Sequence, residues 1–275
     1  MNQGHSQSSS RPILRRIAGR IRRAISVPFR PIAFRIRDWQ APGLHHYMMH
    51  EASIPAQVTN KPALIVAPHA DDETFGCGGI MALKSDAGVS IHVLLLTDGR
   101  SSHTHVAGTN VEELVATRNR EMIEACGILG VPADRIHFLN LPDQGLSRLS
   151  HEAFNDASTR LANLLKQIAP EEVFVNHQFD RHPDHEAGFR ILQHAIERSG
   201  LTPELFQYPI WLIWKGPMHW TRKPAILRGA MRIDVRSVQD RKERAIQVYG
   251  SQLPVLPPGF VKQFQQGYEV FFRQQ

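Results

Sequence analysis

Short apolar runs alternate with amphipathic stretches from residue 62 onward. Four apolar runs have the length and composition of buried strands: 63–67, 90–96, 136–139 and 172–176. Four intervening stretches have helical periodicity: 74–87, 110–127, 150–168 and 185–199. Because strands that alternate with helices pair in parallel through right-handed crossovers, the pattern predicts a doubly wound, Rossmann-like α/β fold. We expect a mostly parallel sheet with helices on both faces and an active site at the carboxyl ends of its strands.

A different pattern occupies the first forty residues. On a helical wheel the aliphatic positions between residues 13 and 25 fall within an arc of roughly 140°, and six arginines fill the opposite side. Pro28 and Pro31 would end this helix. We therefore expect residues 1–40 to form a basic amphipathic arm, residues 41–61 a linker and residues 62–275 the folded domain.

Three interpretations of the arm stay open. Residues 11–39 could lie on an anionic membrane surface, where each cation contributes on the order of 1 kcal/mol. The arm could instead be disordered or pack on the domain, or it could be a transit peptide, since it is rich in Arg and follows a Ser cluster. We expect a cytoplasmic protein, peripheral on the inner face of the membrane if the first interpretation holds.

Composition and charge narrow the function classes. With 42% hydrophobic residues in 275, the chain can bury a sizeable core, and its apolar runs are too short to span a bilayer. Its two cysteines fit a reducing compartment. Nine of the 32 basic residues lie in residues 1–37, so the rest of the chain, which holds all 26 acidic residues, is slightly acidic. Nucleic-acid binding is therefore not expected.

Polar clusters follow three of the predicted strands. His69, Asp71 and Asp72 follow the first, Thr97-Asp98-Gly99 follows the second, and the segment 177–185 follows the fourth. Taken singly, each could be a helix cap or a surface turn. Together, two turns rich in His and carboxylates at one sheet edge predict a mononuclear metal site, since these are the ligands of a catalytic zinc.

Two of these segments resemble the signature of a known family. PHADDE at 68–73 and HPDH at 182–185 are similar to the motif pair of the PIG-L/LmbE-like zinc-dependent N-deacetylases. Further similarities, ordered along residues 62–252, are T-x-G at 97–99, Arg118-x-x-Glu121, Leu-Pro-Asp at 141–143 and Ser-Gln at 251–252. Ala70 departs from the usual Pro, and Arg100 stands where Glu is common.

The resemblance implies a role for each matching residue. His69, Asp72 and His185 would bind Zn²⁺, although the same ligands could hold Fe²⁺. Asp71 would be the general base. A protonated His182 would stabilise the oxyanion and Asp184 would orient His182, while either Asp71 or His182 could protonate the leaving amine.

Residues outside the motif pair have weaker assignments. Arg118 and Asp143 match positions that bind substrate in the family, although Arg118 could instead form a surface ion pair with Glu121. His103 and His105 fall where a specificity loop would lie, although solvent exposure is the commoner fate of such residues. His45, His46 and His50 match nothing and are interpreted as linker residues. The aromatic residues of 206–220 could form a surface that binds a sugar ring or an acyl chain, or a hydrophobic cap on the sheet edge. The hydrophobic cap is favoured, because large aromatic residues usually bury their surface.

The resemblance thus implies that residues 62–275 remove an acetyl group from an N-acetylated amino sugar in a glycoconjugate. A lipid-linked substrate becomes more plausible if the arm rests on a membrane. Alternatives are an amide or ester hydrolase with a non-sugar substrate and a metal-binding module without turnover, which would not need Asp71 and His182. The sequence does not indicate an oligomeric state.

Overall fold

A computed structural model describes residues 43, 45–101, 110–215 and 229–274. Eight strands form one sheet in the order β1-β7-β8-β6-β5-β2-β3-β4. β8 (Tyr268–Arg273) runs antiparallel to its neighbours β6 (Glu204–Tyr208) and β7 (Ala230–Asp234), and the other pairings are parallel. The predicted doubly wound α/β fold is therefore confirmed.

The four strands expected from the apolar runs form one half of the sheet. They are β2 (Ala63–Ala67), β3 (Ile91–Thr97), β4 (Ile136–Leu141) and β5 (Glu172–Asn176). β2 and β5 are buried along their full length. Because a parallel strand covered on both faces has no solvent side, its sequence is mostly apolar, as in all of β2 and in β5 between Glu172 and Asn176.

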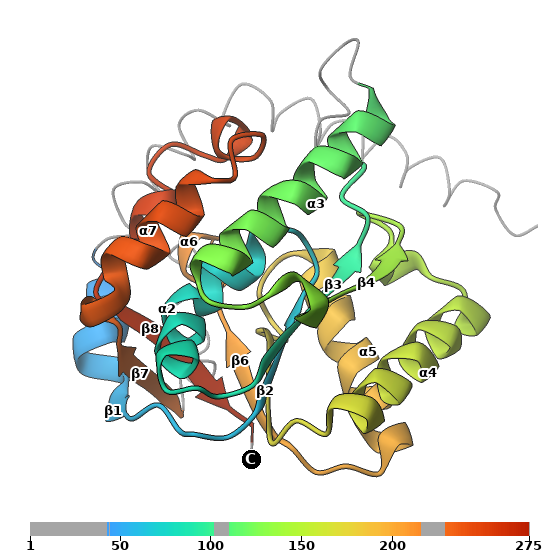
Figure 1. Ribbon diagram of the computed structural model, residues 1–275, viewed down its shortest axis with the longest axis horizontal. Coiled ribbons are helices and arrows are strands. Elements are labelled where there is room, and N and C mark those ends of the chain that lie inside the picture. The colour runs from blue at the N-terminus through green and yellow to red at the C-terminus, as the bar shows by residue number, and fades with distance from the viewer. Residues whose placement is uncertain (1–42, 44, 102–109, 216–228, 275) are drawn as a thin grey trace, which may run out of the picture.

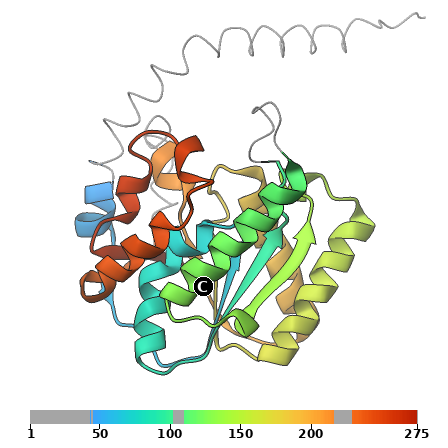
Figure 2. The same ribbon diagram turned by 45° about the horizontal axis from the view of Figure 1, so that its top comes forward.

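Helices cover both faces of the sheet (Figures 1 and 2). On one face α2 (Asp72–Asp86) and α3 (Val111–Ile128) pack beside α7 (Gln239–Gln247), and their apolar residues share a core with Ala63 and Ile65. On the other face α4 (His151–Ile168) and α5 (Pro183–Ser199) share a second core with Leu64 and Val66. The alternation of side chains along β2 therefore supplies both cores.

Part of the segment expected to be a linker belongs to the sheet. β1 (Ile54–Ala56) pairs with β7, and the π-helical turn Met48–Ala52 precedes it. Met48 and Met49 are buried in a third apolar cluster with residues of β7 and β8. The short β1 carries no long apolar run, so periodicity alone does not reveal it.

Small residues near the start of α2 let this helix approach the sheet, as expected. A Cβ on Gly76 would overlap the ring of Tyr208, whose hydroxyl donates a hydrogen bond to the Val66 carbonyl at 2.8 Å. Gly76 therefore sets how close the helix N-terminus lies to the carboxyl ends of β2 and β6.

Several expectations fall outside the described residues: the arm at 1–40, His103 and His105, and Trp220. Among the helices that the structure describes, none is both long and apolar enough to cross a membrane.

Candidate metal and catalytic site

Three potential ligand atoms converge beyond the carboxyl ends of β2 and β5. His69 lies in the loop after β2, Asp72 begins α2 and His185 lies in the first turn of α5. His69 Nδ1 is 3.2 Å from His185 Nε2 and 3.3 Å from Asp72 Oδ2, and His185 Nε2 is 3.2 Å from Asp72 Oδ2. Atoms about 2.0 Å from a tetrahedral zinc lie about 3.3 Å from one another, so this triangle fits one face of such a site.

Other ligand atoms surround the same point. His69, His182 and His185 offer atoms within 4.8 Å of one another, and so do His69, Asp143 and Asp184. The ligand atoms of His69, Asp72 and His185 lie closer together, at 3.2–3.3 Å, and these three residues are the ligands that the family resemblance implies. These residues therefore form a candidate His/Asp metal site.

Asp180, to which the sequence analysis gave no role, holds His185 in place. This buried carboxylate lies 2.6 Å from His185 Nδ1 and accepts the backbone N–H groups of residues 210–212, at the start of α6 (Trp211–Lys215). Because a carboxylate only accepts, Nδ1 carries the proton and Nε2 presents its lone pair. The Asn176 amide, also close to Nδ1 at 2.8 Å, would then turn its oxygen toward this N–H.

Two carboxylates hold the other ring nitrogen of His69. Asp143 Oδ1 lies 3.3 Å and Asp184 Oδ2 3.4 Å from His69 Nε2. Burial alone would raise the pKa of Asp143, but the hydrogen bond to His69 lowers this pKa to about 2. Both carboxylates therefore accept from Nε2, which leaves Nδ1 facing Asp72 and His185.

The structure changes the expected role of Asp184. Its side chain contacts His69 and accepts the Leu146 N–H, while its contact with His182 is made by its backbone N–H, 3.3 Å from His182 Nδ1. The carboxylate is thus a partner of His69 and does not orient the His182 ring. Because HPDH begins a helix, the helical turn points the Asp184 side chain away from its N-cap residue.

Asp71 has a backbone conformation that non-glycine residues rarely adopt, with φ of 133°. Its N–H donates to Glu73 Oε2 at 3.1 Å, and Glu73 Oε1 accepts the hydroxyls of Thr74 and Tyr249. Burial, followed by the charge of Asp72, raises the pKa of Asp71 to about 8. The buried Glu73 network therefore holds Asp71 in a strained backbone conformation beside the His/Asp triangle.

His182 differs from the expected protonated residue. Burial, followed by the nearby His185 and His69, lowers the pKa of His182 to about 2, so its ring is uncharged at neutral pH. Because Nδ1 accepts the Asp184 N–H, the proton of the neutral ring lies on Nε2. His182 can therefore donate a hydrogen bond from Nε2 without carrying a charge.

Arg118 is buried and does not pair with Glu121. Its guanidinium donates to the carbonyls of Gly99 and Ala70, each at 3.1 Å. Glu121 instead accepts the N–H and hydroxyl of Ser251. Arg118 therefore joins the loops that follow β2 and β3, and Glu121 anchors the Ser-Gln segment near the C-terminus.

A cavity of 230 Å³ opens onto these groups. Its polar side includes Asp71, Arg118 and His182, and its apolar side includes Trp211 and Phe260, whose ring centroids are 4.4 Å apart. The aromatic residues of 206–220 thus divide. Trp211 lines the cavity, whereas Phe206, Tyr208 and Trp214 are buried, as the structural interpretation predicts.

Comparisons with known proteins identify the family. The family model described as "GlcNAc-PI de-N-acetylase" matches residues 64–196. A diacetylchitobiose deacetylase from Thermococcus kodakarensis is 28% identical over 70% of this chain and 71% of its own length. The crystal structure of a conserved protein from Thermus thermophilus has 30% identity and a TM-score of 0.54, covering 74% of this chain and 84% of that one.

One relative has a different activity in its name. A 4-oxalmesaconate hydratase from Pseudomonas putida is 26% identical over 70% of this chain and 74% of its own length. The match to the family model covers β2 to α5 and includes every residue of the His/Asp triangle. The chain belongs to the PIG-L/LmbE family of N-acetylglucosamine deacetylases and is a hydrolase.

Proposed function

We propose that the protein is a zinc-dependent deacetylase of an N-acetylated amino sugar in a glycoconjugate, with His69, Asp72 and His185 as the metal ligands. The observation that carries this proposal is the triangle of ligand atoms 3.2–3.3 Å apart beside the buried carboxylate of Asp71. Bound there, zinc would lower the pKa of a water molecule and polarise the acetamide carbonyl. Ferrous iron remains a second metal that this ligand set could hold.

Asp71 is then the general base. Its carboxylate lines the cavity beside the His/Asp triangle and takes the proton of the attacking water. The same residue, once protonated, can return the proton to the nitrogen of the leaving amine. One carboxylate thus serves both steps, and the Glu73 network keeps it in position.

His182 stabilises the oxygen on which negative charge develops. A neutral ring that donates from Nε2 acts as a fixed dipole, and such a hydrogen bond is stronger at the wall of a protein cavity than in bulk solvent. Arg118 also lines the cavity and places its charge near the reacting group. We assign Asp143, Asp180 and Asp184 the task of orienting the two histidine ligands.

The substrate class rests on the family. Three relatives are named for the deacetylation of diacetylchitobiose, of an acetamido-glucopyranosyl inositol and of N-acetylglucosaminyl malate. Each of these three compounds contains an N-acetylated hexosamine. The cavity of 230 Å³, with Trp211 on its apolar side, would receive the acetamido end of such a sugar. The hydratase relative is the reason to test a non-sugar substrate as well.

The test is acetate release from a panel of N-acetylglucosamine conjugates by the full chain, before and after chelation and after zinc is restored. We expect release that depends on the metal and falls by about 10²–10⁴-fold in Asp71→Asn. Asp134→Asn, which changes an exposed carboxylate outside the cavity, is the matched control. Zinc binding without release from any sugar conjugate would refute the sugar substrate and favour the non-sugar alternative.

A further inference from the structure

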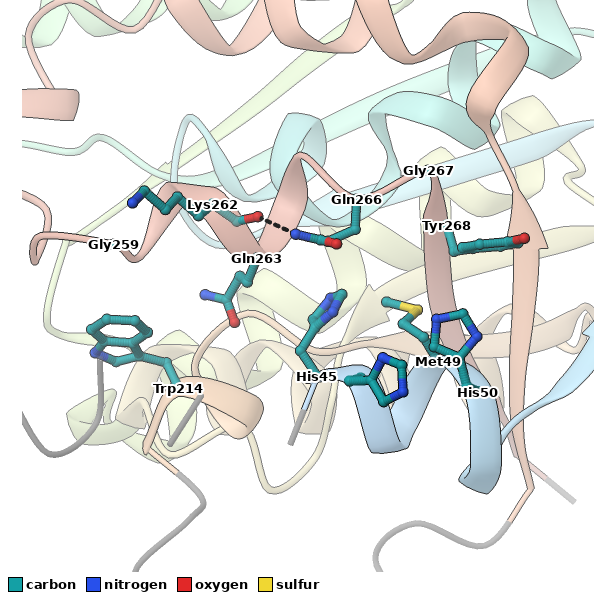
Figure 3. Close-up of a pocket in the computed structure, with 11 residues that line it drawn as sticks. His45, Met49, His50, Trp214, Gly259, Lys262, Gln263, Gln266, Gly267 and Tyr268 are labelled. Carbon is teal, nitrogen blue, oxygen red and sulfur yellow. Dashed lines mark hydrogen bonds between the residues drawn. The ribbon is translucent and has the colours of Figure 1, made fainter. Parts of the chain in front are cut away.

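A second cavity, of 440 Å³, lies between α6, the residues before β1 and the residues before β8 (Figure 3). Its volume is within the range of about 300–1,000 Å³ that is typical of ligand sites, whereas the catalytic cavity is smaller. His45, His50 and Tyr268 are among its lining residues. The histidines interpreted as linker residues thus contribute to a built pocket.

Gln263 is the polar group that this cavity leaves without a partner. Its side chain points into the cavity between Trp214 and His45 (Figure 3), and the residue is only 8% exposed. Neither atom of its terminal amide has a hydrogen-bond partner among the described residues, and the same holds for the buried indole Nε1 of Trp214. Because unpaired buried polar groups are costly, an amide held in this way indicates a ligand that both accepts and donates.

The lining indicates a neutral ligand. None of the described residues around the cavity is acidic, and Lys262, the cation among them, is exposed. Burial, followed by the charge of Lys242, lowers the pKa of His45 to about 4, so that ring is uncharged at neutral pH. An acyl chain would leave the Gln263 amide unpaired, whereas a sugar offers hydroxyl groups to the amide and an apolar ring face to Tyr268.

The second cavity adjoins the catalytic one. Gly259 lines the former and Phe260 the latter, and the rings of Trp211 and Trp214 both pack against Phe260, with centroid distances of 4.4 and 5.7 Å. α6 carries both tryptophans, and its first N–H groups are held by Asp180, the partner of His185. One short helix therefore connects the two cavities.

We propose that the cavity in Figure 3 is a carbohydrate-binding site in which Gln263 forms paired hydrogen bonds with a neutral sugar. That this sugar is the remote unit of the substrate, with the reacting unit in the catalytic cavity, rests on the proposed function. A monosaccharide would occupy one cavity at a time, while a longer conjugate would gain from both.

Binding can be measured without turnover. The probes are N-acetylglucosamine and N,N′-diacetylchitobiose, titrated calorimetrically into the full chain carrying Asp71→Asn. Adding Gln263→Leu should weaken disaccharide binding about tenfold, the effect of losing hydrogen bonds worth about 1.4 kcal/mol. Gln265→Leu, the same change at a half-buried position that lines neither cavity, should leave it unchanged.

Thermal stability gives a second readout that a purely structural glutamine would not reproduce. Leu removes a buried amide without partners, so Gln263→Leu should melt at the same temperature as the parent or higher. Equal disaccharide affinity in a folded Gln263→Leu protein would overturn the proposal. If Gln263→Leu does not fold, the disaccharide affinity of His50→Ala, a change on the exposed rim of the cavity, is measured instead. Unchanged affinity in this second variant would also overturn the proposal.

Kinetics separate this inference from the proposed function. In the active enzyme Gln263→Leu should raise KM for the disaccharide about tenfold and leave kcat/KM for a monosaccharide conjugate unchanged. If no sugar releases acetate but disaccharide binding still depends on Gln263, the proposed function fails and the carbohydrate site stands. If acetate is released and KM does not respond to Gln263, the proposed function stands and the carbohydrate site fails.

Discussion

Replacing Asp180 by Asn should weaken metal binding although Asp180 contacts no metal. The carboxylate lies 2.6 Å from His185 Nδ1 and fixes the proton there, which leaves Nε2 free to bind. An Asn side chain that turns its NH₂ group toward Nδ1 would favour the other tautomer, with the proton on Nε2, where it blocks the ligand position. The change is nearly isosteric, so it tests the proton and charge rather than the packing.

The contacts of Asp180 give the magnitude. Partners that orient a metal-binding histidine typically contribute 10–100-fold in metal affinity. The Asn oxygen can still accept the N–H groups at the start of α6 that Oδ1 accepts now, at 2.9 Å from Ile210 and Leu212. We therefore expect zinc affinity to fall about 10–100-fold and the unfolding free energy of the metal-free protein to fall by only about 1–3 kcal/mol.

Zinc affinity is measured by competition with a chelator of known affinity, and folding by circular dichroism. Acetate release should recover when zinc is added in excess, because the defect lies in metal affinity. Asp234→Asn is a matched control, since that carboxylate pairs with Arg236 on the surface. A folded Asp180→Asn protein with parental zinc affinity would show that Asp180 does not set the tautomer of His185.

Three further predictions concern stability and membrane contact. Burial lowers the pKa of His177 to about 4, so this histidine adds stability above pH 6.5 that is lost as pH falls toward 4, by about 3 kcal/mol. Urea unfolding against pH should show this slope, and His177→Asn should flatten it. Gly76→Ala should cost about 1–3 kcal/mol because its Cβ meets the Tyr208 ring, whereas Gly127→Ala, with open space on α3, should stabilise by roughly 0.5–1 kcal/mol in the same melts. If the arm lies on membranes, changing all six arginines between residues 11 and 23 to Gln should weaken sedimentation with anionic vesicles at least tenfold and leave neutral vesicles unaffected.

Local signals explain which elements could be predicted. β2 to β5 are short apolar runs, and each is followed by one of the longer helical segments α2 to α5, so their places in the chain follow from the hydrophobic pattern. β1, β7 and β8 are short or lie at the antiparallel side of the sheet. β1 pairs with β7 although the two strands lie more than 170 residues apart, and β8 is inserted between β7 and β6. Such pairings depend on side-chain packing across strands, which periodicity does not report.

The hydrophobic pattern and the motifs predict the α/β class, the sheet edge that holds the site and most of the residues that meet there, but not Asp180. Which carboxylate contacts which histidine depends on tertiary packing: Asp180 contacts His185, and Asp143 and Asp184 contact His69. This packing also brought Gln263 and His45 to one cavity although they lie more than 200 residues apart. A motif specifies the type and spacing of its ligand atoms, whereas their directions depend on the packing of separate elements against one another.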